Sequence, residues 1–383
     1  MSIEGRLKIG FIPLVDAATL IIAVDMGFTK DEGLDVELVR EVSWSNIRDR
    51  LAAGHYDGAH LLAPMAVASS LGLSHVKVPL IAALNLATNG NAITVSPDLH
   101  VKLQAASDGD LSDPAVSSRA LKRVISAREI AGEEPLTFAL TFPFSTHNYQ
   151  LRYWLASGGI DPDQDLRLVV LPPPFMVDNL AKGQIDGFCV GAPWNAVAAE
   201  AGLGTVLHPT CAIINPSPEK VLAFRADDTT RDPVRVEALI RACLRATDFI
   251  AKEENHAEAA ALLSRPDRVG VDPHVISRTF IGAPVVGGER YGDYLVFCDR
   301  QSGRPDLYQV SWIFAQMLRW RQTGFSCERL RLAQSVCEPR HFDHAAGASN
   351  PHAHKAITAF DGLDFDEGSI RTYINAFTIG AKF

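Results

Sequence analysis

"LAAGHYDGAHLLAP", residues 51–64, recurs 129 positions further on as "LAKGQIDGFCVGAP", residues 180–193. The copies share seven of fourteen residues, in the pattern L-A-x-G-x-x-D-G-x-x-x-x-A-P. Each copy reads as a helix end, a glycine turn and a short apolar run, which is typical of a helix that leads into a buried strand. Chance similarity between two such junctions is the alternative. The order of the flanking elements also repeats, however, so the sequence predicts one α/β design used twice.

Strands and helices alternate around both copies. Near the first copy, apolar periodicity and capping residues predict elements at 7–13 (strand), 16–33 (helix), 34–42 (strand), 43–54 (helix) and 56–62 (strand). Near the second copy they predict a strand at 136–143, a helix from Ser145 and a strand at 165–173. Such alternation is typical of βαβ units and a mostly parallel sheet. We therefore expect two similar α/β lobes with a ligand cleft between them, at the carboxyl ends of the strands.

The predicted lobes divide the chain into three parts. Residues 1–98 form the first part of lobe 1, residues 99–214 form lobe 2, and residues 215–383 return to lobe 1. The return begins with a hinge strand and continues into a helix-rich region, with helical apolar spacing at 232–254 and 306–324. These helices are expected to cover the outside of lobe 1.

Composition excludes several classes of protein. The 383 residues carry a net charge of −9 and no basic stripe, which argues against direct nucleic-acid binding. We find no run of about 18 apolar residues, so no membrane helix is expected. The six cysteines are scattered without a CxxC pair, and the first residues lack the apolar core of a secretory signal. Together these features predict a cytoplasmic protein with reduced thiols.

Two predicted helix starts carry residues that could bind a ligand. His147 follows Ser145 and Thr146, either of which can cap a helix, so His147 lies in the first turn. Backbone N–H groups of that turn favour an anion. Trp44 occupies the same kind of position in the first lobe, where its indole N–H could donate to a ligand. The alternatives are a histidine packed against the neighbouring lobe and a tryptophan that merely covers a helix start.

Asn91 and Lys220 complete the candidate cluster. Asn91 precedes an apolar stretch and could point an amide donor into the cleft, although turn chemistry at Asn89-Gly90 is the alternative. Lys220 opens the apolar run Val221–Phe224 and either reaches solvent or faces an anion. Such a set of donors suits a small anion. It lacks the paired carboxylates of an acid–base enzyme and the glycine-rich cradle of a nucleotide site.

Five motifs in order resemble those of a known family: "SWSNIRDRL", "NGNAIT", "FPFSTHNYQLRYWLA", "DGFCVGAPWN" and "PEKVLAF". From about residue 7 onward the chain resembles the nitrate- and bicarbonate-binding proteins of bacterial ABC transporters and their soluble relative, the nitrate/nitrite sensor of nitrate-assimilation operons. The resemblance implies a two-lobed periplasmic-binding-protein-like (type II) fold with the anion in the cleft. It places Trp44, His147 and Lys220 on anion-binding positions and implies a backbone contact from Gly191.

Three positions bear on the choice of anion. Asn91 stands where the nitrate transporter proteins have glutamine, a difference that could shift the preference between nitrate and nitrite. Ala192 stands where they have an acidic residue. Lys220 stands where the bicarbonate-binding relatives carry an acidic residue, so the resemblance implies an obligate anion such as nitrate. We expect Lys220→Glu to abolish nitrate binding and to leave the fold intact, because the lysine would serve the ligand and not the core.

The resemblance, joined to the absence of a visible signal peptide, predicts a cytoplasmic nitrate/nitrite sensor. In that system the sensor releases an RNA-binding antiterminator protein when the anion binds, and lobe closure is the natural switch. The alternative is the extracytoplasmic nitrate-binding component of an ABC transporter, which would share every cleft residue. Neither function needs a cofactor.

Enzymatic and metal-binding functions are less well supported by the sequence. Cys189 and His147 could form a Cys–His nucleophile pair, but Cys189 lies within a predicted strand, where a buried structural thiol is typical. The spacing of His341, His344, His352 and His354 permits metal binding, whereas a solvated loop over 341–355 is the simpler interpretation. We therefore expect neither an enzyme nor a metal site.

Overall fold

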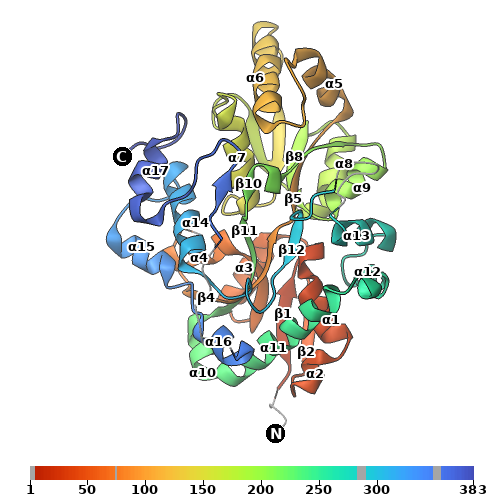
Figure 1. Cartoon of the computed structure of the whole chain (residues 1–383), viewed down its shortest axis with the longest axis vertical. Helices are drawn as coiled ribbons and strands as arrows, with labels where there is room; N and C mark the ends of the chain where they lie inside the picture. The colour runs from red at the N-terminus through yellow and green to blue at the C-terminus, as the bar shows by residue number, and fades with distance from the viewer. Residues whose placement is uncertain (1–4, 74–75, 283–289, 348–354) are drawn as a thin grey trace.

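Two mixed β-sheets form the framework of the protein. The computed structural model describes residues 5–73, 76–282, 290–347 and 355–383. In the described part of the chain, the larger sheet has the strand order β12 (Leu295–Phe297), β4 (Leu80–Asn89), β11 (Pro218–Arg225), β3 (Gly58–Leu62), β1 (Leu7–Phe11), β2 (Val36–Arg40). The smaller sheet has the order β7 (Arg167–Val170), β6 (Thr137–Leu140), β8 (Gly187–Gly191), β5 (Asn91–Val95), β9 (Thr205–Pro209). The larger sheet lies in the lower half and the smaller sheet in the upper half of Figure 1.

The two sheets share one plan, as the sequence repeat predicts. In the larger sheet β1 pairs in parallel with β2 and β3, and in the smaller sheet β6 pairs in parallel with β7 and β8. The two copies of the repeat supply equivalent elements. One copy contributes the end of α3 (Trp44–Ala52) and β3, and the other the end of α8 (Met176–Ala181) and β8. The predicted two-lobed α/β architecture is therefore confirmed.

The prediction of mostly parallel sheets was wrong. β11 runs antiparallel to β3 and β4, and β5 runs antiparallel to β8 and β9. These are the strands that follow a crossing between the sheets, so each enters its sheet from the opposite end. The first crossing joins β4 to β5 at Gly90, and β11 begins after the second. The division of the whole chain at 98/99 and 214/215 stays a prediction.

The first predicted helix is broken. Residues 16–33 contain the end of a 3₁₀ turn η1 (Val15–Ala17), α1 (Ala18–Asp25) and α2 (Phe28–Asp31) in place of one helix. Gly27 has a φ of 79°, a left-handed conformation that glycine adopts without steric cost and that ends a helical run. The helix predicted over 306–324 likewise ends early, at Arg319, because Arg321 takes a φ of 56°.

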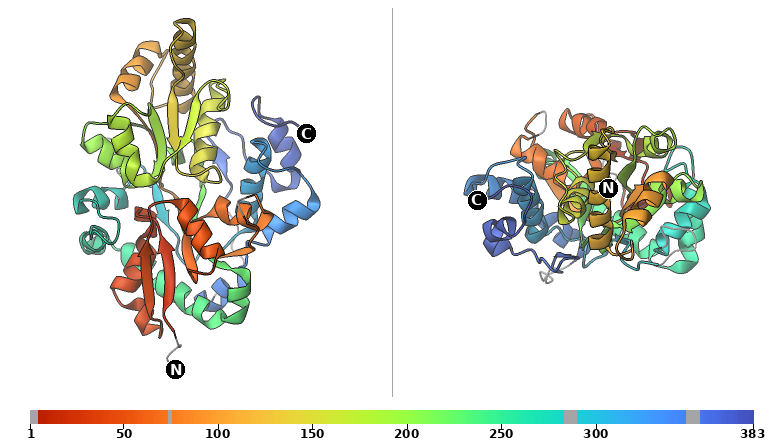
Figure 2. Two further views of the ribbon diagram at one scale, coloured as in Figure 1. Left: turned by 180° about the vertical axis from the view of Figure 1, so that it is seen from behind. Right: turned by 90° about the horizontal axis from the view of Figure 1, so that it is seen from above.

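Helices cover both faces of the larger sheet. α1 and α11 (Pro233–Ile250) share a core with β1, β4 and β11 on one face, whereas α3, α4 (Ala63–Leu71) and α14 (Leu307–Arg319) pack on the other (Figure 2). α14 also reaches the upper lobe, where its Trp312 ring lies 6.4 Å from the ring of Tyr149 in α7 (Thr146–Ser157). The helix-rich C-terminal part of the chain therefore covers the first lobe as expected and also packs against the second.

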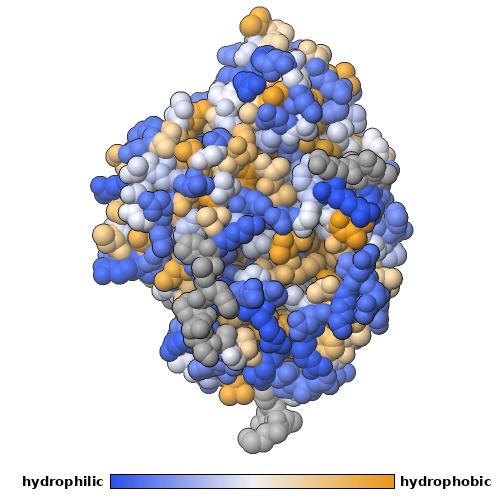
Figure 3. All heavy atoms as spheres, viewed as in Figure 1, coloured by the Kyte–Doolittle hydropathy of each residue, from blue (hydrophilic) through white to orange (hydrophobic). Residues whose placement is uncertain are grey.

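The remaining helices lie on the outside of the two lobes. They are α5 (Pro97–Ala106), α6 (Pro114–Ile130), α9 (Trp194–Glu200), α10 (Ala226–Arg231), α12 (His256–Leu263), α13 (Pro273–Phe280), α15 (Cys327–Gln334), α16 (Arg340–Ala346) and α17 (Ile370–Asn375). In the face shown in Figure 3, hydrophilic residues cover most of both ends, and hydrophobic side chains gather midway along the molecule. Within the described ranges, no helix combines the length and the apolar character needed to cross a bilayer.

The histidine-rich segment differs from the predicted loop. His341 and His344 lie in the helix α16, and each has its Nδ1 atom within 4 Å of Glu237 Oε1, at 3.7 and 3.1 Å. His352 and His354 lie outside the described residues.

Candidate functional site

The five predicted ligand-binding residues meet where the two sheets face each other. Trp44 opens α3 and Lys220 lies in β11, both in the lower lobe. Asn91 opens β5, His147 lies in the first turn of α7, and Gly191 ends β8, all in the upper lobe. Asn91 and Gly191 are direct partners across two antiparallel strands. The side chains of the four residues other than Gly191 are each at most 1% exposed, so the lobes are closed over this cluster.

Helix caps position Trp44 and His147 as the sequence predicts. The hydroxyl of Ser43 accepts a hydrogen bond from Asn46 N at 3.2 Å, and that of Ser145 accepts one from Asn148 N at 3.1 Å. Both helices therefore begin at the seam between the lobes. Their first N–H groups and the positive ends of their dipoles lie beside the cluster, an arrangement that favours negative charge.

Lys220 does not reach solvent, so the snorkelling alternative was wrong. Its side chain is fully buried, and Nζ lies 2.9 Å from Asp16 Oδ2 and 2.8 Å from Glu219 Oε1. The ammonium also lies 5.6 Å from the ring centroid of Trp44. The expectation of a site without paired carboxylates was therefore also wrong, because Asp16 and Glu219 both contact the lysine.

Local backbone geometry explains both missed carboxylates. Neighbouring residues in a regular strand point to opposite faces of the sheet. The pairing of β11 with β4 shifts register between Pro218 and Lys220 and again after Lys220, and this irregularity allows Glu219 and Lys220 to meet. Asp16 follows β1 at its carboxyl end, a position at which ligand-site residues gather in α/β folds. The cleft predicted at the carboxyl ends of the strands includes the segment Pro13–Ala17, although Asp16 itself was not among the predicted site residues.

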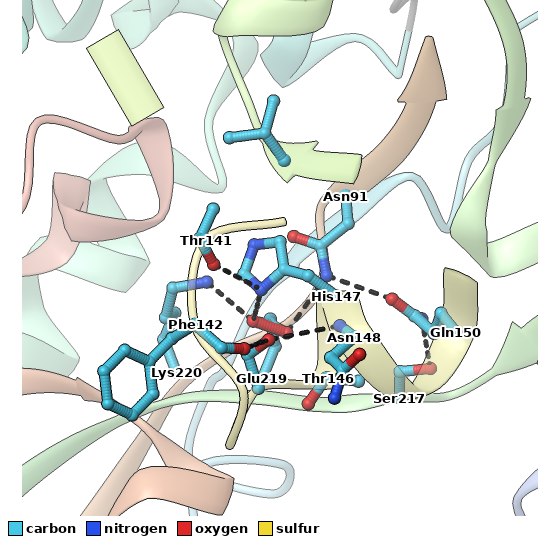
Figure 4. Close-up of polar contacts among 12 residues, drawn as sticks. Asn91, Thr141, Phe142, Thr146, His147, Asn148, Gln150, Ser217, Glu219 and Lys220 are labelled. Atoms are coloured by element: carbon cyan, nitrogen blue, oxygen red, sulfur yellow. Dashed lines mark hydrogen bonds and ion pairs between the residues drawn. The ribbon is translucent and has the colours of Figure 1, made fainter. Parts of the chain in front are cut away.

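Asn91 presents its carbonyl oxygen, not the amide donor that we expected. Its Nδ2 atom donates to Gln150 Oε1 at 3.1 Å and to Glu219 Oε2 at 3.0 Å (Figure 4). Both partners fix this orientation. A carboxylate only accepts hydrogen bonds, and Gln150 donates its own Nε2–H to Ser217 Oγ. Asn91 Oδ1 is left without a hydrogen-bond partner among the described residues.

Two further polar atoms of the five predicted ligand-binding residues have no hydrogen-bond partner in the described part of the chain. They are Trp44 Nε1 and His147 Nε2, and both are buried. A buried donor or acceptor that lacks a partner costs about 1–3 kcal/mol, so such atoms mark sites where a ligand can complete the bonding. Lys220 has three N–H groups, and contacts to Asp16 and Glu219 account for two of them. The third is a further donor.

Electrostatics favours the charged forms of Lys220 and Asp16. Burial opposes ionisation of Asp16, but the Lys220 ammonium and a hydrogen bond from His60 outweigh it and lower the Asp16 pKa to about 2. Burial likewise opposes the charge of Lys220, and the two carboxylates outweigh it and raise the lysine pKa. For Glu219 burial prevails and raises the pKa. Burial and the nearby ammonium lower the pKa of His147 well below its usual value, so at neutral pH the imidazole is neutral.

Asp16→Asn is expected to lower the free energy of unfolding by about 2 kcal/mol at pH 7. This value follows from the difference between the pKa of Asp16 in the folded protein, about 2, and the pKa of a free aspartate, 3.8. Because the folded-state pKa is the lower one, this contribution is present above pH 4 and is lost as the pH falls towards 2. Urea unfolding of both proteins between pH 2 and pH 7 measures it. The exposed-residue control Glu129→Gln should follow the wild type, and a constant difference at all pH values would refute this assignment.

Cys189 does not have the surroundings of a nucleophile. It is fully buried in β8, and burial raises the pKa of its thiol well above the usual value. A thiolate, not a thiol, is the attacking species in cysteine catalysis. The interpretation of Cys189 as a structural thiol therefore fits its environment better than a Cys–His pair.

Known proteins resemble the chain over nearly its whole length. Residues 4–264 match the NMT1-like family. The chain is 35% identical to the nitrate import ATP-binding protein NrtC of a Synechocystis species, covering 98% of this chain and 55% of NrtC. It is 32% identical to the nitrate/nitrite binding protein NrtA of a Nostoc species, covering 98% of this chain and 86% of NrtA. The crystal structure of the periplasmic nitrate-binding protein NrtA from Synechocystis has a TM-score of 0.88 at 28% identity and covers 98% of each chain.

These comparisons agree with the two-lobed architecture. The chain spans about half the length of NrtC but most of the length of NrtA. The periplasmic-binding-protein-like fold expected from the motifs is thereby confirmed. The chain belongs to the NMT1-like family and is a homologue of the NrtA nitrate-binding proteins.

Proposed function

We propose that the protein binds nitrate or nitrite between its lobes, in contact with Trp44, Asn91, His147, Gly191 and Lys220. The observation that carries this proposal is the fully buried Lys220 ammonium at the seam, in a cluster where Trp44 Nε1 and His147 Nε2 have no hydrogen-bond partner among the described residues. The ammonium and the indole N–H can donate hydrogen bonds to an ion of a few atoms, and the imidazole can do so when Nε2 carries its hydrogen. Because they come from both lobes, the ion can enter only when the lobes separate, and it would favour their closure.

A role in nitrate import fits the comparisons better than the cytoplasmic sensor that we expected. The relatives include proteins of nitrate import, nitrate/nitrite binding and periplasmic nitrate binding, and also proteins of bicarbonate transport and bicarbonate binding. None of these names includes an antiterminator partner. We therefore favour the alternative: the protein acts outside the cytoplasm or as part of an import complex, and its partner is the ATP-driven import machinery. The relatives are binding and transport proteins, and a binding function without catalysis accords with the buried Cys189.

Thermal unfolding in the presence of anions tests the proposal. A ligand that binds only the folded state stabilises it by about 2.7 kcal/mol at one hundred times its Kd. We expect nitrate or nitrite to raise the unfolding midpoint by a few degrees, with chloride and sulfate at equal ionic strength as controls. A rise with bicarbonate alone would assign the site to a different anion. No rise with any of these anions would contradict the proposed function.

A further inference from the structure

Glu219 contacts three of the five predicted ligand-binding residues. Its Oε1 lies 2.8 Å from Lys220 Nζ and 3.4 Å from His147 Nδ1, and its Oε2 accepts the 3.0 Å hydrogen bond from Asn91. The carboxylate is fully buried. Figure 4 shows Glu219 at the centre of this network, with the second nitrogen of His147 on the far side of the ring. The orientation of the ligand-facing groups therefore depends on Glu219.

The proton on the Glu219–His147 dyad decides what His147 can offer a ligand. A neutral imidazole carries one N–H, and an ionised carboxylate 3.4 Å from Nδ1 favours the tautomer in which Nδ1 carries it. Nε2 then has only a lone pair. The hydroxyl of Thr141, 3.3 Å from Nδ1, can donate or accept and does not oppose this arrangement. With one more proton on the dyad, shared between Glu219 and Nδ1, Nε2 carries an N–H and becomes a donor.

Nitrate and nitrite have only acceptor atoms. A dyad that holds one proton, on Nδ1, would direct the Nε2 lone pair at the anion, beside the carbonyl oxygen of Asn91, which is also an acceptor. The net charge of the cluster leads to the same conclusion, because the two carboxylates of Asp16 and Glu219 exceed the single positive charge of Lys220. Binding a further negative charge without a proton would be unfavourable on both grounds.

We propose that Glu219 is a positioning residue through which the site takes up one proton with each nitrate or nitrite that it binds. This inference rests on the proposed function. Before binding, the dyad holds one proton, on Nδ1. After binding it holds two, and Nε2–H donates to the anion. Bicarbonate carries its own hydrogen, which it can donate to the Nε2 lone pair or to Asn91 Oδ1, so it needs no proton from solvent.

Other titratable groups face the dyad from three neighbouring elements and from β11 itself. Asp16 comes from η1, His60 from β3, Cys189 from β8 and Lys220 from β11. The Asp16 pKa is lowered to about 2, that of Lys220 is raised, and that of Cys189 is raised well above its usual value, so none of these titrates between pH 5.5 and pH 9. Burial lowers the pKa of His60, which bonds to Asp16. Burial raises the pKa of Glu219, which favours proton uptake by the dyad.

Calorimetric titration of the whole protein with sodium nitrate tests the proposal. Titrations at one pH in buffers of different ionisation enthalpy count the protons taken up, and we expect about one per nitrate at pH 8. The Kd for nitrate should then rise about tenfold per pH unit on the alkaline side. Binding with constant affinity from pH 5.5 to pH 9 and no proton uptake would overturn this inference and leave the proposed function standing. No nitrate binding at any pH would overturn both.

Variants separate Glu219 from its neighbours. Glu219→Gln removes the carboxylate that holds the Nδ1–H tautomer, so nitrate binding should become independent of pH above pH 6. His60→Gln serves as the control and should keep the pH dependence of the wild type. The proposal would be overturned if nitrate binding lost its pH dependence in His60→Gln and kept the wild-type pH dependence in Glu219→Gln. The proton would then be taken up by a group other than the Glu219–His147 dyad. The proton count on the wild type tests the inference even where a variant fails to fold.

Discussion

Lys220→Glu is expected to destabilise the protein by about 3–5 kcal/mol, the usual cost of breaking a buried ion pair. The substitution would replace the ammonium that contacts Asp16 and Glu219 with a third carboxylate in a fully buried cluster. Like charges at such distances repel strongly where water is excluded. This result differs from the expectation based on sequence, in which the lysine served only the ligand and its replacement left the fold intact.

Urea unfolding at pH 7 measures this effect. Lys220→Met, which keeps a long side chain and adds no charge, should lose less stability than Lys220→Glu. The exposed-residue control Lys252→Glu should stay within about 0.5 kcal/mol of the wild type. If Lys220→Glu lost less than 1 kcal/mol, the ion-pair role assigned to Lys220 would be wrong.

Gly191→Ala is expected to weaken nitrate binding by about tenfold to a hundredfold and to leave the fold intact. A Cβ atom at Gly191 would meet Asn91 Oδ1 at 3.4 Å and Asp16 Oδ2 at 3.5 Å, which are ordinary contact distances. The backbone there is not in the left-handed region, so alanine introduces no strain. The methyl group would, however, occupy space beside the atoms proposed to hold the anion, and overpacking of this kind costs about 1–3 kcal/mol.

Calorimetric titration with nitrate, together with thermal unfolding without anion, checks this prediction. Gly109→Ala is a matched control, since its Cβ would meet only Val116, at 3.5 Å. We expect both variants to unfold near the wild-type midpoint, with nitrate binding weakened in Gly191→Ala alone. Unchanged affinity in Gly191→Ala would exclude Gly191 from the binding site, and an unfolded variant would show that the glycine serves packing.

The sequence was sufficient for the features that depend on local patterns. The repeat at 51–64 and 180–193 predicts equivalent strands, and β3 and β8 occupy equivalent places in the two sheets. Ser43 and Ser145 predict helix starts, and both cap their helices. These signals are reliable because periodicity and capping are properties of neighbouring residues.

The missed features depend on contacts between distant segments. Asp16 and Lys220 lie 204 positions apart in sequence, and only the fold shows that they form an ion pair. The orientation of Asn91 depends on Gln150 and Glu219, which are likewise remote. Glu219 stands beside Lys220 in the sequence, but strand alternation predicts that the two point apart, and only the register shift in β11 brings them together. A pattern read along the chain carries no information on such contacts.

The central claim is that the anion binds against Trp44 at the seam, and proton–nitrogen NMR of the tryptophan indole groups tests it most directly. The chain has five tryptophans, and the Trp44→Phe spectrum identifies the Trp44 signal by its absence. The indole N–H of Trp154 donates to Pro114 O, and that of Trp194 to Pro13 O. Saturating nitrate should shift the Trp44 indole resonance strongly and that of Trp154 little, because only the former lacks a partner within the described protein. An unmoved Trp44 resonance, with nitrate bound at saturation, would contradict the account.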